Sequence, residues 1–218
     1  MSHELRGPLN VILGYVDLLD LGVHGPLTAR QRIDLGSIRQ AEQQLLLMIN
    51  DLLDFLKVQS GQLTYRTAEV SVRDLLTSAV TLMKPAIEKK GLSEHSLPCD
   101  PDVTVRADPD RTRQILLNLL NNAIKFTGSG GHLELECEAT HEAVQIRVSD
   151  SGAGIPPDRL QDVFRPYVQV GAPQTNSKMG VGLGLAISRD LARGMHGDLT
   201  VDSTVGVGST FTLTLPRH

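Results

Sequence analysis

The sequence contains few cysteines and no tryptophan. Its two cysteines, Cys99 and Cys137, are far apart in the sequence and form no Cys-x-x-Cys pair. A structural zinc site and a disulfide scaffold are therefore not expected, and a reducing compartment fits this cysteine usage best.

A large excess of one charge is also missing. The chain has 21 lysines and arginines against 25 aspartates and glutamates, which gives a formal net charge of -4. This balance offers no bulk electrostatic argument for a nucleic acid or an anionic membrane as partner. Apolar runs such as 45–49 are far shorter than the about 20 residues that span a bilayer. No basic segment followed by an apolar stretch opens the chain, so we expect no secretion signal and a cytoplasmic location.

The first 60 residues carry a helical period. Apolar residues recur at alternating steps of four and three in two segments: Leu5, Leu9, Ile12, Val16, Leu19 and Val23, then Ile38, Ala41, Leu45, Met48, Leu52 and Phe55. These steps are typical of coiled-coil seams. Between them Thr28-x-x-Gln31 predicts a capping box at the start of a second helix. We expect a helical hairpin that pairs with a second copy into a four-helix bundle. A hairpin folded onto its own C-terminal domain is the alternative.

The pattern changes after Gly61. Alternating polar and apolar residues predict strands at 63–72, 103–107, 132–139, 144–150, 199–203 and 210–216. Helical stretches fall at about 72–90, 109–127 and 182–195. The predicted fold class is α+β, with a hairpin domain at 1–61 and an α/β sandwich domain at 62–218. In this sandwich one sheet is covered on one face by helices.

Polar side chains gather at the end of the predicted helix 109–127. Asn118 and Asn122 are four residues apart and share one face, and Lys125 follows about a turn later. Amide oxygens are hard ligands that suit Mg2+, and lysine offers charge to phosphate oxygens. Helix capping and ordinary surface exposure are the alternative roles for these residues.

Two glycine-rich segments follow. Asp150 ends a predicted strand, and Gly152 and Gly154 next to it allow the backbone to approach a flat ligand. An ordinary turn is the alternative. The second segment includes Lys178, Gly180, Gly182, Gly184 and Leu185, and its glycines directly precede an apolar helix that can cradle phosphates at its N-terminus. It matches neither a P-loop nor a dinucleotide-binding fingerprint.

The order of these segments is specific. Asn-x-x-x-Asn-Ala-x-Lys-Phe, Asp-x-Gly-x-Gly-Ile, Phe164-Arg-Pro-Tyr167 and Gly-x-Gly-Leu-Gly-Leu together resemble the ATP-binding domain of sensor histidine kinases. They are similar to that family's N box, first glycine box, phenylalanine box and second glycine box. The resemblance covers most of residues 108–215, and it implies the nucleotide-binding sandwich shared with gyrase and Hsp90.

The resemblance also implies roles for individual residues. Asp150 would hold the adenine amino group, and Asn122 would bind Mg2+, with Asn118 and Lys125 near the phosphates of ATP. The second glycine segment would form the phosphate cradle and a hinge, and Thr210 would lie at the nucleotide site where a turn enters the last strand. The segment Ser2-His-Glu-Leu-Arg-Gly-Pro-Leu-Asn10 is similar to the family's phospho-acceptor box. This similarity places the phosphorylated histidine at His3 and its acidic helper at Glu4.

Two features qualify the expected activity. Gly7 stands where this subgroup usually has threonine or asparagine, which in the family positions the water that removes phosphate from the partner regulator. We therefore expect histidine kinase and phosphotransfer activity, with an aspartate of a response regulator receiver domain as acceptor, and weak or absent phosphatase activity. Pro8 removes the N–H that would bond the carbonyl of Glu4, so it loosens the helix beside His3.

Two other functions fit parts of the sequence. One is an ATP hydrolase of the gyrase and Hsp90 type. Those relatives carry glutamate at the position of Asn118, and an amide cannot accept the proton of an attacking water. The other is a nucleotide-binding scaffold without catalysis. Family members usually have more helix before the phospho-acceptor histidine, so we expect a catalytic core separated from its sensor region, through which the parent protein could be attached to a membrane.

Overall fold

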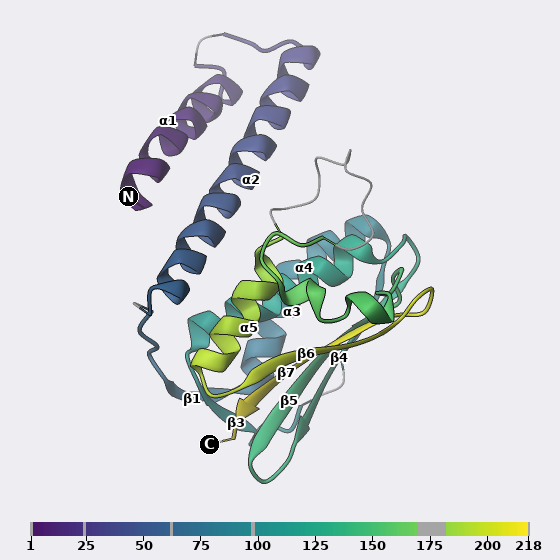
Figure 1. Ribbon diagram of the computed structural model, residues 1–218. Coiled ribbons are helices and arrows are strands. Elements are labelled where there is room, and N and C mark those ends of the chain that lie inside the picture. Colours follow the sequence, from purple (N-terminus) through teal and green to yellow (C-terminus); the bar gives the residue numbers. More distant parts are fainter. Residues whose placement is uncertain (1, 24, 62, 97–98, 170–181, 218) are drawn as a thin grey trace. The chain divides into compact units, whose positions relative to one another are not determined.

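The computed structural model describes residues 2–23, 25–61, 63–96, 99–169 and 182–217. Its contacts divide the chain into two compact units, Met1–Gly61 and Gln62–His218 (Figure 1). No described helix is long and apolar enough to cross a membrane.

The first unit is a helical hairpin of α1 (Ser2–Asp20) and α2 (Ala29–Gln59). The predicted capping box is present, because the Thr28 hydroxyl accepts a hydrogen bond from the Gln31 N–H and the Gln31 side chain accepts one from the Thr28 N–H. Arg39 of α2 also pairs with Asp17 of α1, with 2.7 Å between Nη2 and Oδ1. Pro8 lies inside α1.

The apolar seams of the hairpin are only partly covered within one chain. Leu9 and Val16 of α1 are buried. Apolar side chains on both helices remain exposed: Val11, Ile12, Tyr15, Leu18, Ile38, Leu45, Leu52 and Leu56. A single hairpin thus leaves many of its described apolar side chains exposed to water.

The second unit is built on a five-stranded sheet with the order β2-β4-β5-β7-β6. Its strands are β2 (Ser93–Ser96), β4 (His132–Ala139), β5 (Ala143–Asp150), β6 (Asp198–Thr204) and β7 (Gly208–Pro216). The strand β2 runs parallel to β4, and the other neighbours are antiparallel. A separate pair joins β1 (Ala68–Ser71) to β3 (Thr104–Ala107).

Three helices cover one face of this sheet (Figure 1). They are α3 (Val72–Lys90), α4 (Pro109–Phe126) and α5 (Gly184–Gly194), and two short turns, η1 (Pro157–Arg159) and η2 (Asp162–Phe164), precede α5. The core consists of fully buried side chains from α4, α5 and the sheet: Ile115, Leu116, Leu119, Leu120, Leu133, Leu135, Ile146, Leu191, Leu199 and Leu213. The predicted fold class, a hairpin followed by an α/β sandwich, is confirmed.

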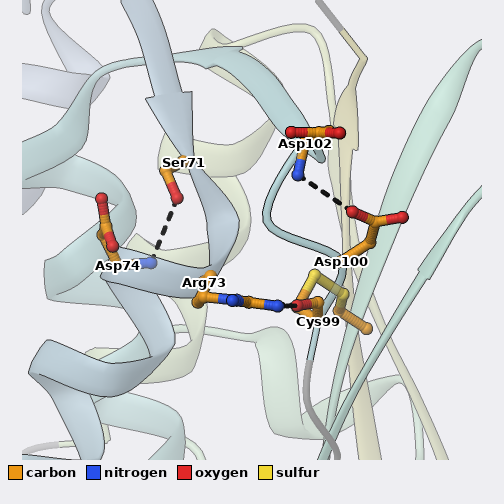
Figure 2. Close-up of a disulfide and its surroundings, with 7 residues drawn as sticks. Ser71, Arg73, Asp74, Cys99, Asp100 and Asp102 are labelled. Atoms are coloured by element: carbon orange, nitrogen blue, oxygen red, sulfur yellow. Dashed lines mark hydrogen bonds between the residues drawn. A yellow bond between two sulfur atoms is a disulfide. The ribbon is translucent and has the colours of Figure 1, made fainter.

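The expectation that the cysteines form no disulfide is wrong. Cys99 and Cys137 are joined by a disulfide, with their Cα atoms 5.5 Å apart (Figure 2). The bond ties the segment before β3 to β4, and the Arg73 guanidinium donates two hydrogen bonds to the Cys99 carbonyl. These cysteines are 38 residues apart and meet only because the fold brings the two segments together. Their number and spacing therefore carry no argument for a reducing compartment.

Candidate functional site

Asp150 is a buried acceptor at the end of β5. Its side chain is 9% exposed, and Oδ1 accepts a hydrogen bond from the Gly152 N–H at 2.8 Å. Burial raises the pKa of Asp150 above its ordinary value, while hydrogen bonds from the backbone of Gly152 and Ser209 oppose that rise. A partly desolvated carboxylate of this kind suits a ligand that donates hydrogen bonds.

The glycines after Asp150 let this loop approach other backbone segments closely. A Cβ atom at Gly152 would lie 2.7 Å from the Phe126 carbonyl oxygen, and one at Gly154 would lie 2.2 Å from the Thr204 carbonyl oxygen. Gly154 also has a positive φ of 71°. These contacts place the loop between the end of α4 and the turn that joins β6 to β7.

A cavity of about 300 Å3 opens beside Asp150. Its wall comes from the ends of four strands and one turn: His132, Asp150, Asp202, Ser203, Thr204, Val207, Gly208, Ser209 and Thr210. Apart from Val207 and Gly208, these residues have side chains with a hydroxyl, an imidazole or a carboxylate group. The cavity can therefore bind a polar ligand.

Two neighbouring residues of β7, Ser209 and Thr210, line this cavity from opposite faces of the strand. Asp150 pairs in register with Ser209, and Ser149 pairs with Thr210. Because side chains alternate along a strand, Ser209 shares a sheet face with Asp150 and Thr210 lies on the other face. There the Thr210 hydroxyl is 2.9 Å from Ser149 Oγ. Sequence reasoning missed Ser209, although the alternation along β7 could have identified it.

The partly exposed face of α4 carries polar side chains, and one of them contacts α5. Asp108 caps α4 by accepting hydrogen bonds from the Asp110 and Arg111 N–H groups. One face of α4 is buried in the core, while Asn118 and Asn122 stay partly exposed. Asn118 Nδ2 donates a hydrogen bond to Ser188 Oγ of α5 at 2.9 Å.

Lys125 stands at the C-terminal end of the same helix. Its ammonium lies 5.0 Å from the centre of the Phe126 ring. Partial desolvation lowers the pKa of Lys125, although much of the side chain is exposed. The structure thus places Asn118, Asn122 and Lys125 on one helix, and Phe126 contacts the glycine loop that follows Asp150.

The second glycine segment leads directly into α5. Gly182 has a φ of 76°, and its carbonyl accepts a hydrogen bond from the Tyr167 N–H at 2.9 Å. Gly184 is the first residue of α5, and no side chain among the described residues caps this helix end. The first N–H groups of α5, including that of Leu185, are therefore available to an anion. Lys178 and Gly180 lie outside the described residues.

The predicted phospho-acceptor residues lie in the other unit. His3 and Glu4 belong to the first turn of α1, and the placement of their side chains lies outside the described part of the structure. The predicted site residues therefore fall into two parts, one in the sandwich domain and one on the hairpin.

Comparison with known families accounts for both parts. Residues 107–218 match the family described as "Histidine kinase-, DNA gyrase B-, and HSP90-like ATPase", and residues 1–61 match "His Kinase A (phospho-acceptor) domain". The chain belongs to the sensor histidine kinases. The enzyme class expected from the sequence, a protein-histidine kinase, is confirmed at the level of the family.

Individual relatives agree with this assignment. The chain is 40% identical to the sensor protein GacS of Pseudomonas syringae pv. syringae, over 99% of this chain and 24% of that protein. It is 38% identical to the autoinducer 2 sensor kinase/phosphatase LuxQ of Vibrio parahaemolyticus, over 99% of this chain and 26% of that protein. The chain thus spans about a quarter of the length of these curated relatives.

Solved histidine kinase structures have the same fold. Full-length ShkA in complex with AMPPNP superposes with a TM-score of 0.83 at 35% identity, over 99% of this chain and 44% of that chain. The Acinetobacter baumannii histidine kinase AdeS superposes with a TM-score of 0.68 at 20% identity, which shows a shared fold.

The residues of this chain fit a nucleotide with a bound Mg2+ ion. Asp150 supplies a buried acceptor, and Asn118 and Asn122 supply amide oxygens. Among the described residues, no three His, Cys, Asp or Glu side chains gather into a metal site. A metal ion here would depend on amide and phosphate oxygens, which are ligands that Mg2+ accepts.

Proposed function

We propose that this chain transfers the γ-phosphoryl group of ATP to His3 and then to an aspartate of a response regulator. The observation that carries the proposal is the juxtaposition of Asn118 with the start of α5. Asn118 belongs to the segment that resembles the N box, and Gly184 at the start of α5 belongs to the one that resembles the second glycine box, so the two boxes are in contact. Asp150 supplies a buried acceptor in the same domain.

The residues of the sandwich domain bind and orient ATP. Asp150 accepts a hydrogen bond from the adenine amino group, and the open N–H groups of α5 bind phosphate oxygens. Lys125 adds positive charge beside the phosphates. Asn122 would hold Mg2+, and the ion would supply positive charge that offsets the negative charge on the phosphate oxygens.

The hairpin supplies the nucleophile. The neutral form of an imidazole has a free lone pair on one ring nitrogen, and this lone pair makes His3 the nucleophile. Its attack forms a P–N bond as the bond from the γ-phosphorus to the β–γ bridging oxygen breaks, and ADP leaves. Glu4 holds the proton of the other ring nitrogen and stabilises the positive charge on the ring.

The second transfer reverses the chemistry at the histidine. A carboxylate oxygen of the regulator attacks the phosphorus, the P–N bond breaks and the ring becomes neutral again. Because the regulator supplies the acceptor, the hairpin needs exposed residues around His3 for docking. Gly7, Pro8 and Asn10 are exposed on α1.

We also propose that the hairpin pairs with a second copy. The exposed apolar residues Ile12, Ile38 and Leu45 belong to the seams that predict a four-helix bundle. Burying such side chains between two hairpins would stabilise the dimer by about 25 cal/mol for each Å2 of apolar surface removed from water. Sedimentation of the full chain tests this directly: a monomer at micromolar concentration would contradict it.

Labelling with ATP tests the central proposal. Incubation with ATP carrying a radioactive γ-phosphate should label the wild-type chain and leave His3→Gln unlabelled, and site mapping should find the label on His3. Phosphate release without labelled protein would instead support an ATP hydrolase. Nucleotide binding with neither label nor phosphate release would support a scaffold.

A role for Pro8 in signalling is a separate proposal. Its ring breaks one hydrogen bond of α1 one turn after Glu4, so the helix can bend at this position. In Pro8→Ala the helix should stiffen, and the phosphorylation rate or its response to an upstream signal should change. Unchanged values of both would contradict the proposal.

A further inference from the structure

A single hydroxyl group connects the two nucleotide-binding helices. Ser188 of α5 is 2% exposed, and its neighbours on the buried face of the helix, Ala186, Ile187, Leu191 and Ala192, are apolar. Ser188 Oγ accepts a hydrogen bond from Asn118 Nδ2 at 2.9 Å. A polar atom this deeply buried normally has a definite partner, and here the partner is an amide of the N box.

In this hydrogen bond the Asn118 amide turns its donor nitrogen toward Ser188. An amide group carries its donor nitrogen and its acceptor oxygen on opposite sides of Cγ. Since Nδ2 faces Ser188, Oδ1 faces away from it, toward the first residue of α5. A Cβ atom on Gly184 would lie only 2.4 Å from Asn118 Oδ1, so the oxygen lies directly against this helix start.

The orientation matters for the ligand because only one end of an amide can bind a cation. If the amide rotated by half a turn, its NH2 group would face the helix start and would repel a metal ion. We propose that Ser188 is a positioning residue that holds the Asn118 amide with its oxygen directed toward the Mg2+ ion of bound Mg2+–ATP. The proposal rests on the proposed function, since that function places the phosphates at the start of α5 and Mg2+ at Asn122, one turn along the same face of α4.

A residue that orients a ligand-binding side chain without touching the ligand has a measurable effect on ligand affinity. Loss of a residue that orients a metal-binding or phosphate-binding group typically weakens metal affinity or activity by roughly 10- to 100-fold. A residue that only fills space would instead reduce stability and affect every ligand of the domain equally. These two patterns separate the proposal from ordinary packing.

Nuclear magnetic resonance of the full chain tests the contact without any ligand. The side-chain amide signals of Asn118 are assigned from their loss in Asn118→Asp. In the wild type the bonded Nδ2 proton should be shifted downfield and protected from exchange with water. Ser188→Ala should abolish both features, Ser188→Thr should retain them, and Ala192→Gly, a change in the same helix away from Asn118, should leave them unchanged.

Calorimetric titration then tests the consequence. Ser188→Ala should weaken binding of Mg2+–AMPPNP by roughly 10- to 100-fold, while adenosine, which lacks phosphates, should bind as tightly as it does to the wild type. Ser188→Thr should restore Mg2+–AMPPNP binding. The double variant Ser188→Ala/Asn118→Ala should bind no more weakly than Asn118→Ala, because Ser188 acts through Asn118.

The outcomes distinguish this proposal from the proposed function. A wild type that binds no Mg2+–AMPPNP would overturn both. A wild type that binds while Ser188→Ala binds equally well would overturn the role of Ser188 alone. Equal losses for adenosine and Mg2+–AMPPNP in Ser188→Ala would show that the residue acts only through stability, and would also overturn its positioning role.

Discussion

Arg189 of α5 lies over the ring of Phe164, with its guanidinium carbon 4.6 Å from the ring centre. The same guanidinium donates to Asp198 at the start of β6, where Nε is 3.0 Å from Oδ1. Arg193 donates to the same carboxylate oxygen. The phenylalanine box is thereby connected to α5 and to the edge of the sheet through one side chain.

The first prediction concerns the pH dependence of stability. Burial alone would raise the pKa of Asp198, but hydrogen bonds from Arg189, Leu199 and Arg193 outweigh it and lower that pKa from 3.8 to about 2. A lowered pKa in the folded state stabilises the protein above the unfolded value, and this contribution is lost as pH falls from about 4 to about 2. Since the Asp198 side chain is 39% exposed, we expect Asp198→Asn to cost about 1 kcal/mol at pH 7.

Urea unfolding at several pH values measures this difference. The gap between wild type and Asp198→Asn should be largest at neutral pH and should close toward pH 2. Asp202→Asn, an exposed carboxylate on the same strand, is the control and should show little change. A gap that does not depend on pH would contradict the assignment.

The second prediction concerns Asp150 as the adenine acceptor. Asp150→Asn replaces an ionised acceptor with an amide, and loss of a hydrogen bond to a charged group costs about 1.5–3 kcal/mol, which is roughly a 10- to 150-fold loss of ATP affinity. Because burial raises the pKa of Asp150, protonation should weaken wild-type binding at a higher pH than an ordinary aspartate would. Titration calorimetry across pH measures both effects. Asp102→Asn changes an exposed carboxylate outside the wall of this cavity and should bind ATP normally.

The third prediction separates folding from nucleotide binding at Gly184. Alanine is a better helix former than glycine, so Gly184→Ala should change the free energy of unfolding by less than about 1 kcal/mol. The new methyl group would displace the Asn118 amide, and Mg2+–AMPPNP affinity should fall about tenfold, or about 1.4 kcal/mol. Gly36→Ala is the matched control, because no described atom lies within 4 Å of a Cβ there. Normal affinity in Gly184→Ala would show that the displaced amide does not contact the ligand.

The fourth prediction concerns phosphatase activity. The wild type should barely accelerate loss of phosphate from its phosphorylated regulator, because Gly7 has no side chain to position water. No described atom lies within 4 Å of a Cβ at position 7, so Gly7→Thr introduces a hydroxyl without a clash. This variant should gain phosphatase activity while phosphorylation of His3 continues. Rapid dephosphorylation by the wild type would refute the prediction.

The fifth prediction concerns the disulfide. Reduction, or the variant Cys137→Ser, should lower the free energy of unfolding by about 3 kcal/mol, because the bond restricts a loop of 38 residues in the unfolded chain. Denaturant unfolding of the purified protein with and without dithiothreitol measures this loss. Cys137→Ser should no longer respond to the reductant, and equal stability of the oxidised and reduced wild type would contradict the prediction.

Local sequence patterns predicted most of the secondary structure. The helices α3, α4 and α5 lie within one or two residues of the helical stretches at 72–90, 109–127 and 182–195. The capping box at Thr28 was also predictable, because it depends on residues three apart. The parallel edge strand β2 was not predicted. Its four residues are polar, and only pairing with β4 makes them a strand.

The sequence by itself determined the domain class and the order of the nucleotide-binding motifs, and it predicted residues for phosphoryl transfer. These features depend on neighbouring residues and on short, fixed spacings. Only the tertiary structure decided that Cys99 meets Cys137, that Ser209 rather than Thr210 shares a face with Asp150, and that Ser188 accepts a hydrogen bond from Asn118. Those relationships join residues that are tens of positions apart. No local preference specifies such contacts, because they form only when the whole core packs.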